Sequence, residues 1–421
     1  MTRASRPNVR AGLEFRRDPL GFLLSLDDGD ELVRFRAGLT DFALIKNPAT
    51  IHRILVADAA LYGEGKWTLR GERVMRDCLI TLDGARHRDR RALLRPGFDR
   101  RRLVGTAQNM VERADRLDGL WQDGATIDTR AEMRRLALAA TGEALFSLDL
   151  EPEADALVPA LATMLKEISR PGLPWPAGRR LAAARKVVDR TVTRAVAQRR
   201  ENQANDDDVL SLLLGGGQNG HGRLTDAEIA DEMVSLLMAA VDTTPGTLAW
   251  TWHLLARHPE VEARVHEELD AVLHGRRPNA EDLPRLEYLG LVLTEVLRLY
   301  PPVHFIDRRP VVDVELDGHR IAAGSFLLLS PLLTHRDPRL YEEPTEFRPE
   351  RWTRERQEDR PRYGYFPFGG GPHACIGMTL ARMEILLVVA TLARHWRMRV
   401  SPDLQDLSPQ TTILPMALAR R

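Results

Sequence analysis

Cysteine is scarce in this 421-residue chain, which has only Cys78 and Cys375. Two cysteines are too few for a disulfide framework, which excludes a small disulfide-stabilised fold and favours a reducing compartment. Neither sign of charge is in excess, since Lys+Arg and Asp+Glu each total 60. No overall attraction to nucleic acid or to an anionic membrane is therefore expected, and any charged docking site must be local.

No apolar run of signal-peptide or membrane-anchor length follows Met1, and no low-complexity linker divides the chain. These absences favour a cytoplasmic protein without a membrane anchor, folded as one large domain or two intimate lobes. Hydrophobic residues make up 43% and charged residues 29%, which is typical of a globular chain with a sizeable core.

The hydrophobic pattern predicts a mainly α protein with small β-sheets. Two hairpins are expected, at residues 32–45 and 312–321. Over residues 86–300, apolar positions recur every three or four residues, which indicates helices. A proline-rich break at 171–176 and a glycine-rich loop at 215–220 interrupt this pattern.

The best-defined helix begins at a capping box, in which Thr225 precedes Glu228 by three positions. The apolar stripe continues to about Arg257, where His258-Pro259 ends it. At ~1.5 Å per residue, this helix is roughly 45 Å long, enough to cross the whole molecule.

The clearest motif is FGGGPHACIG at residues 368–377. Glycines let the backbone approach a flat ligand closely, and Cys375 lies near a predicted helix start, where the dipole favours a thiolate. An isolated cysteine in such a loop would be a free thiol. The whole decapeptide fits F-x-x-G-x-x-x-C-x-G, however, and resembles the haem-binding loop of the cytochrome P450 superfamily of haem-thiolate monooxygenases.

This resemblance implies one domain over residues 1–421, shaped as a triangular helix-rich prism around a buried haem b. It places a β-rich lobe near residues 30–60 and 303–335, and a helix-rich lobe at 86–300. Cys375 is then the iron ligand, and three further loop residues lie beside the haem: Phe368, Gly369 and Gly377.

The segment EVLR brings Glu295 and Arg298 onto one helical face, where they can pair. Alone, such a pair is usually a solvated contact of small value. Because Pro301-Pro302 follow, the segment resembles the family's E-x-x-R helix, and Arg351 in FRPERW matches its downstream partner. The implied role of the three residues is structural support of the haem loop.

AAVDTT at residues 239–244 resembles the family's oxygen-activation motif, with Ala240 where glycine is usual. An acid beside an alcohol can relay protons from solvent, so Asp242, Thr243 and Thr244 are the catalytic candidates. The competing interpretation is that the threonines bond to their own helix carbonyls. Pro245 predicts a local bend, because it cannot donate to the carbonyl of Val241.

Haem propionates need cationic partners where they are buried. His87 and Arg91 lie one helical turn apart and match the family's H-x-x-x-R pair, while Arg308 and His373 match its remaining two contacts. Any one of them alone would be read as a solvated basic residue.

The resemblance also predicts a largely apolar substrate cavity, which favours a hydrophobic substrate such as a terpenoid or polyketide. His304 and Asp307 are polar exceptions that either orient a substrate group or face solvent. The segments expected to line the cavity are 63–82, 173–175, 233–240, 303–306 and 412–414.

No flavin or nicotinamide domain is present in the sequence, so a ferredoxin and its reductase are the expected electron donors, and a monomer is the expected form. A basic docking patch near Cys375 would consist of Arg100, Arg101, Arg102 and Arg362.

Three alternatives remain open. A peroxygenase would take its oxidant from hydrogen peroxide, although that subgroup generally lacks the pair Asp242-Thr243. A haem-binding sensor or electron carrier would need neither a substrate cavity nor a proton relay. A helical scaffold without haem would make all the matched segments accidental.

Overall fold

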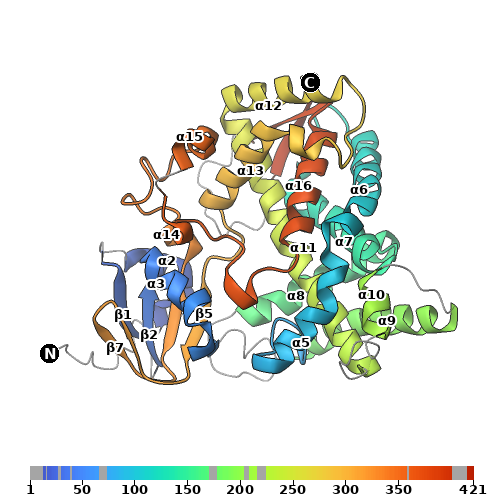
Figure 1. The fold of residues 1–421 in the computed structure, drawn as a ribbon. Coiled ribbons are helices and arrows are strands. Elements are labelled where there is room, and N and C mark those ends of the chain that lie inside the picture. Colours follow the sequence, from blue (N-terminus) through green and yellow to red (C-terminus); the bar gives the residue numbers. More distant parts are fainter. Residues whose placement is uncertain are drawn as a thin grey trace.

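A single long helix, α11 (Asp226–Arg257), runs through the middle of the molecule, with the other long helices around it (Figure 1). The structure is a computed structural model that describes residues 13–15, 17–26, 30–37, 40–65, 74–169, 178–202, 208–215, 224–357, 360–400 and 415–421. The other helices of eight or more residues in these ranges are α5 (Gly84–Leu94), α6 (Arg100–Leu120), α7 (Thr129–Phe146), α8 (Ala154–Ser169), α9 (Arg179–Asn202), α12 (Pro259–Leu273), α13 (Glu287–Leu299) and α16 (Met378–Leu392).

The predicted start and end of α11 are confirmed. Thr225 accepts from the backbone N–H of Glu228, and the Glu228 side chain accepts from the N–H of Thr225, so both halves of the capping box form. The helix ends at His258, and α12 begins at once with Pro259 in its first position. Pro245 lies inside the helix, which continues past it.

Shorter helices connect the larger elements or pack beside the sheet. They are α2 (Pro19–Ser25), α3 (Pro48–His52), α10 (Val209–Gly215), α14 (Pro331–Thr334) and α15 (Arg354–Gln357).

Strands collect on one side of the molecule in a five-stranded sheet of order β1-β2-β8-β5-β3 (Figure 1). Its strands are β1 (Leu32–Ala37), β2 (Thr40–Ile45), β3 (Tyr62–Glu64), β5 (Ile306–Pro310) and β8 (Phe326–Leu329). The pair β2 and β8 is parallel, and the other neighbours are antiparallel. The first predicted hairpin is β1–β2, and it is confirmed.

The second predicted hairpin is also confirmed, as β6 (Val314–Leu316) and β7 (His319–Ile321). Asp317 and Gly318 both have positive φ between the strands, as a two-residue turn of this kind requires. A third sheet contains β4 (Thr126–Asp128), β10 (Pro415–Arg420) and β9 (Trp396–Val400). β4 interrupts the region 86–300, which is therefore not helical throughout.

Two large hydrophobic clusters divide the helical part along α11. Its first half, including Met233 and Leu237, packs with α6 to α10. Its second half, including Leu248 and Trp252, packs with α12, α13, α16 and β9. Because α16 contributes to both clusters, the helix that follows Cys375 is held against both halves of α11.

Candidate active site

The loop before α16 is shaped by glycine. Gly369 and Gly371 have φ of +70° and +66°, which L side chains rarely adopt. A Cβ on Gly371 would lie 1.8 Å from the carbonyl oxygen of Leu55, so this position tolerates no side chain. The backbone N–H of Cys375 donates to the carbonyl of Phe368 at 2.9 Å and closes the loop.

Cys375 is exposed although burial raises the pKa of its thiol. The thiol is thus desolvated by the surrounding protein and still accessible on one side. The N–H of Gly377 and the charge of Arg91 lower the pKa only in part. α16 begins three residues later, at Met378, and desolvation is the largest influence on the pKa of the thiol.

The middle of α11 is open on one face. Ala239 is exposed, while Ala240, Asp242 and Thr243 are half-buried and Thr244 is buried. The Thr243 hydroxyl donates to the carbonyl of Ala239 at 2.7 Å. This is the bond to a carbonyl of its own helix that the competing interpretation predicts. Thr243 therefore lies on the open face with its oxygen available as an acceptor.

Asp242 is held by two arginines from α7 that the sequence did not single out. Its Oδ2 accepts from Arg130 at 3.0 Å and its Oδ1 from Arg134 at 2.6 Å. Gly246, one turn after Asp242, lies beside Arg130, and a Cβ there would be in ordinary van der Waals contact with its guanidinium at 3.4 Å. The spacing of the arginines, i and i+4 on one helix face, was the only local signal of such a clamp.

Glu295 and Arg298 on α13 are both fully buried, with N–O distances of 2.8 Å, so they are not a solvated pair. Arg351 donates to Glu295 at 2.9 Å, as the E-x-x-R resemblance implies, and the Trp352 indole adds a bond of 2.7 Å. One buried carboxylate thus joins α13 to the segment that follows α14.

The same arginine connects α13 to the start of the cysteine loop. Arg298 donates to the carbonyl of His335 at 2.8 Å, and the His335 ring accepts from the N–H of Phe366 at 2.9 Å. Burial lowers the pKa of His335 to about 3, so its ring nitrogen is free to accept this bond. The link from Glu295 to the loop is a chain of buried polar contacts.

Three of the four basic residues expected at haem lie together. The rings of His87 and His373 stack with centroids 3.8 Å apart, and burial together with His373 and Arg91 lowers the pKa of His87 to about 4. Arg308 is linked to His373 through Glu64, which is close to both. Arg91 has no ion-pair partner within the described part of the chain, and burial lowers its pKa.

The sequence profile of the family described as "Cytochrome P450" matches residues 27–419. The chain belongs to the cytochrome P450 family. It is accordingly an oxidoreductase of the monooxygenase type, and the family implies a haem cofactor. The residues present fit that group: Cys375 is desolvated and still reachable, glycines bring the backbone close beside it, and Arg91 is half-buried without an anionic partner in the described ranges.

Two curated P450 relatives align along most of the chain. The pentalenene oxygenase of Streptomyces avermitilis is 33% identical over 98% of this chain and 92% of its own length. The cyclooctat-9-en-7-ol 5-monooxygenase of Streptomyces melanosporofaciens is 34% identical over 92% and 86%. A solved structure of retinoic acid-bound cyanobacterial CYP120A1 has the same fold, with a TM-score of 0.86, 24% identity, and coverage of 95% and 96%.

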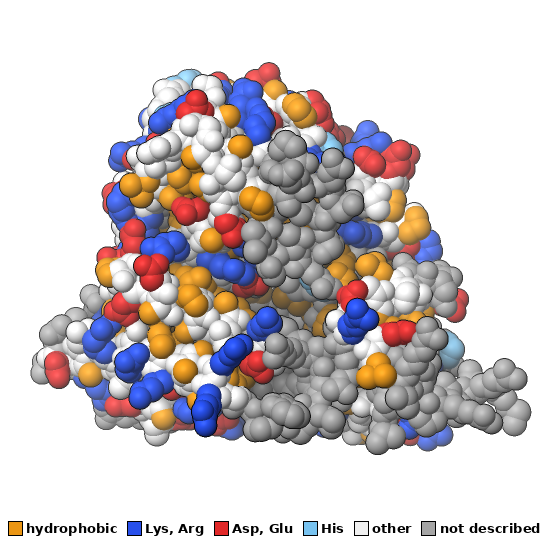
Figure 2. All heavy atoms as spheres, turned by 180° about the vertical axis from the view of Figure 1, so that it is seen from behind, with side chains coloured by type: hydrophobic (Ala, Val, Ile, Leu, Met, Phe, Trp, Pro, Cys, Tyr) orange, Lys and Arg blue, Asp and Glu red, His pale blue; other side chains and the backbone are white. Residues whose placement is uncertain are grey.

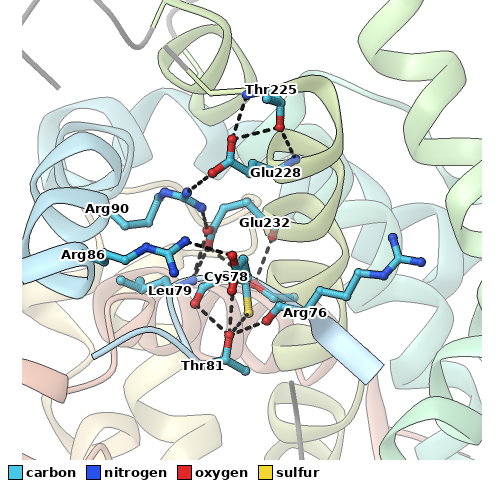
Figure 3. A network of polar contacts seen from close by, with 11 residues as sticks. Arg76, Cys78, Leu79, Thr81, Arg86, Arg90, Thr225, Glu228 and Glu232 are labelled. Atoms are coloured by element: carbon cyan, nitrogen blue, oxygen red, sulfur yellow. Dashed lines mark hydrogen bonds and ion pairs between the residues drawn. The ribbon is translucent and has the colours of Figure 1, made fainter. Parts of the chain in front are cut away.

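A second buried acid lies on this P450's long helix. Glu232 accepts from Arg90 of α5 at 2.6 Å, and both its oxygens lie 3.0 Å from the N–H of Leu79 (Figure 3). Figure 3 also shows Arg90 between Glu232 and Glu228. These contacts hold the segment before α5 against α11, and the sequence did not predict them.

Cys78, whose role the sequence left open, belongs to the same network. It is fully buried, with Sγ 3.5 Å from the Thr81 hydroxyl (Figure 3). Burial, and next the charge of Glu232, raises the pKa of its thiol. Cys78 is therefore a protonated core residue.

The expected substrate segments are described only in part: 173–175, 412–414 and 66–73 lie outside the described residues. Of 233–240, positions 233–238 are buried in the core, and only Ala239 and Ala240 reach the open face. Val303 is 45% exposed. Burial, with Arg336 and Arg130, lowers the pKa of His304 to about 4, so its ring is neutral at physiological pH.

Three of the four arginines that were expected to form a docking patch are exposed. Arg102 donates to the carbonyls of Gly97 and Ala144 at 2.8 and 2.9 Å, which leaves Arg100, Arg101 and Arg362 exposed. On the back of the molecule, basic and acidic side chains are interspersed (Figure 2).

Within the described ranges, no helix combines the length and the hydropathy needed to cross a bilayer.

Proposed function

We propose that this P450 holds haem b through the thiolate of Cys375 and oxidises a hydrophobic small molecule, of the terpenoid class, with molecular oxygen. The observation that carries the proposal is the position of Cys375, desolvated and yet open, after a glycine loop that admits no side chain at Gly371. Thiolate-bound haem supplies the activation of dioxygen. The test is the carbon monoxide difference spectrum of the reduced protein, which should show a strongly red-shifted main band. An imidazole-like band in undenatured protein would refute the proposal.

The residues around the loop divide into two proposed roles. His87, Arg91, Arg308 and His373 would hold the propionates, and the backbone of Phe368, Gly369 and Gly377 would lie beside the haem. Burial opposes ionisation of the Cys375 thiol, so the positive charge of a bound iron would be what stabilises the thiolate. Glu295, Arg298 and Arg351 maintain the loop through His335 and Phe366.

Proton delivery is proposed for Asp242 and Thr243. The Thr243 oxygen lies on the open face of α11, with Ala240 beside it and Thr244 buried behind. The Asp242 side chain is 38% exposed, so water reaches it while Arg130 and Arg134 hold it. When one of these arginines swings away, the carboxylate can take a proton from solvent water and pass it inward, which leaves it ionised again, and the Thr243 hydroxyl would orient the proton donor on the inner side.

The terpenoid class is proposed from two independent considerations. One relative is named as a pentalenene oxygenase and another as a cyclooctat-9-en-7-ol 5-monooxygenase. Ala239, Ala240 and Val303 present apolar surface in this chain. A panel of cyclic terpenes should convert the ferric haem spectrum from low to high spin, while polar compounds of equal size should not. His304→Ala tests whether the neutral ring contacts a substrate hydroxyl.

The electron donor is proposed to be a ferredoxin with its reductase, docking on Arg100, Arg101 and Arg362. Charge reversal at Arg100 and Arg101 should slow reduction and weaken its salt dependence, and unchanged reduction would contradict this surface. We also propose a cytoplasmic, monomeric protein with one domain over residues 1–421.

A further inference from the structure

Glu64 is a buried acid among the basic residues assigned to haem. The register of β3 and β5 pairs Glu64 with Arg308 directly across the strands. Its Oε2 lies 3.3 Å from the Arg308 guanidinium and its Oε1 lies 3.0 Å from Nδ1 of His373. One carboxylate that is 7% exposed thus engages two of the four residues expected to hold propionates.

A second acid lies beside it. Asp83, the N-cap of α5, is 3.7 Å from Nε2 of His373, and it accepts from the backbone N–H of Glu64 at 3.3 Å. The His87 ring stacks on His373, and the charges of Glu64 and Asp83 act to raise its pKa against the larger lowering caused by burial. Strand β3, the start of α5 and the cysteine loop therefore meet at Glu64.

Charged side chains of both signs already meet in this cluster. Arg91 and Arg308 are basic, Glu64 and Asp83 are acidic, and the buried Asp307 precedes Arg308 in β5. Two propionates would add two negative charges where surrounding protein weakens solvent screening. Any propionate that binds Arg308 or His373 must share that side chain with Glu64.

We propose that Glu64 competes with the haem propionates for Arg308 and His373, so that it weakens haem retention while it stabilises the polypeptide around the site. This inference rests on the proposed haem binding. It makes Glu64 a positioning residue whose charge acts on the cofactor without touching the iron.

The test compares the wild type with Glu64→Gln, which keeps the shape of the side chain and removes its charge. Loss of haem to excess apomyoglobin should slow on the order of tenfold, and the midpoint reduction potential should become more positive, because a negative charge no longer opposes the added electron. Urea unfolding of the haem-free variant should begin at lower urea. Faster or unchanged haem loss with an unchanged potential, or failure of folded E64Q to take up haem, would overturn the proposal.

Two controls separate charge competition from general effects. Glu315→Gln removes a glutamate that also faces an arginine, Arg320, across a strand pair, but in the exposed β6–β7 hairpin, and it should leave haem loss unchanged. Haem dimethyl ester carries no propionate charge, so E64Q should not slow its loss. A wild type without the red-shifted carbon monoxide band would instead refute the proposed function, before any variant is compared.

Discussion

Arg134 of α7 donates to Asp242 of α11 at 2.6 Å, across 108 positions of sequence. This contact, with that of Arg130, places the proposed proton donor under the control of a neighbouring helix. An acid clamped by two arginines is held in one orientation, and it can take a proton from solvent and pass it on only when the clamp opens. Substitution of each residue in turn can therefore test the role of Asp242 separately from that of Thr243.

Asp242→Asn should lower turnover by roughly a hundredfold or more, because an amide cannot carry the proton. Haem content should be unchanged. The measurement is substrate oxidation per haem with saturating reductant. Asp226→Asn is the matched control, since Asp226 is also paired with an arginine, Arg200, but at the exposed start of the same helix. Equal loss in both variants would exclude a specific relay through Asp242.

Thr243→Ala should keep haem and substrate binding but divert electrons into hydrogen peroxide, because the ordered donor on the open face is lost. Peroxide formed per electron pair consumed measures this, and Thr243→Ser should restore coupling. Thr247→Ala is the control: its hydroxyl also donates to a helix carbonyl, that of Thr243 at 3.0 Å, but it is buried. Wild-type coupling in the Thr243→Ala variant would assign the relay to another group.

Glu295→Gln should unfold at lower urea and retain little haem. The buried carboxylate compensates two buried arginines, and breaking such a network costs about 3–5 kcal/mol of unfolding free energy. Glu287→Gln on the same helix is exposed and should cost less than about 1 kcal/mol. Urea unfolding and the haem-to-protein absorbance ratio report both effects. A fully loaded, stable E295Q would show that the network does not support the loop.

Gly371→Ala should abolish haem loading. Its Cβ would lie 1.8 Å from a backbone oxygen of Leu55, and φ is +66°, so the loop must move. Gly290→Ala on α13, where a Cβ meets open space, should instead be neutral or stabilising by about 0.5–1 kcal/mol. Soret absorbance per protein distinguishes the two. Normal loading of the first variant would mean that the loop has an alternative conformation.

Glu384 should make stability depend on pH. Burial raises its pKa from the ordinary 4.5 to about 8. Between these values the folded chain keeps a proton that the unfolded chain releases, so this group's contribution to the unfolding free energy falls as pH rises. The advantage of Glu384→Gln over the wild type should grow by roughly 1.4 kcal/mol per pH unit.

Urea unfolding at pH 5.5 and 7.5 measures that difference. Glu267→Gln, an exposed change on α12, should show none. A constant difference between Glu384→Gln and the wild type would mean that Glu384 ionises at its ordinary pH inside the folded chain.

Much of the fold and part of the site were predictable, because their signals are local. The capping box at Thr225, the turn at Asp317-Gly318 and the glycine spacing around Cys375 each depend on a few adjacent residues. The strand β4 was missed, since three residues carry too little periodicity to be recognised. The desolvation of Cys375 could not be predicted, because a sequence does not show how deeply a group is buried.

By itself, the sequence determined the helices, the hairpins and the identity of the cysteine loop. Only the tertiary structure decided which charges meet: Arg130 and Arg134 with Asp242, Arg90 with Glu232, and Glu64 with Arg308. The partners are more than 100 positions apart. The physical reason is that a local pattern specifies backbone conformation and an apolar face, whereas the partner of a buried charge is set by the packing that removes both from water.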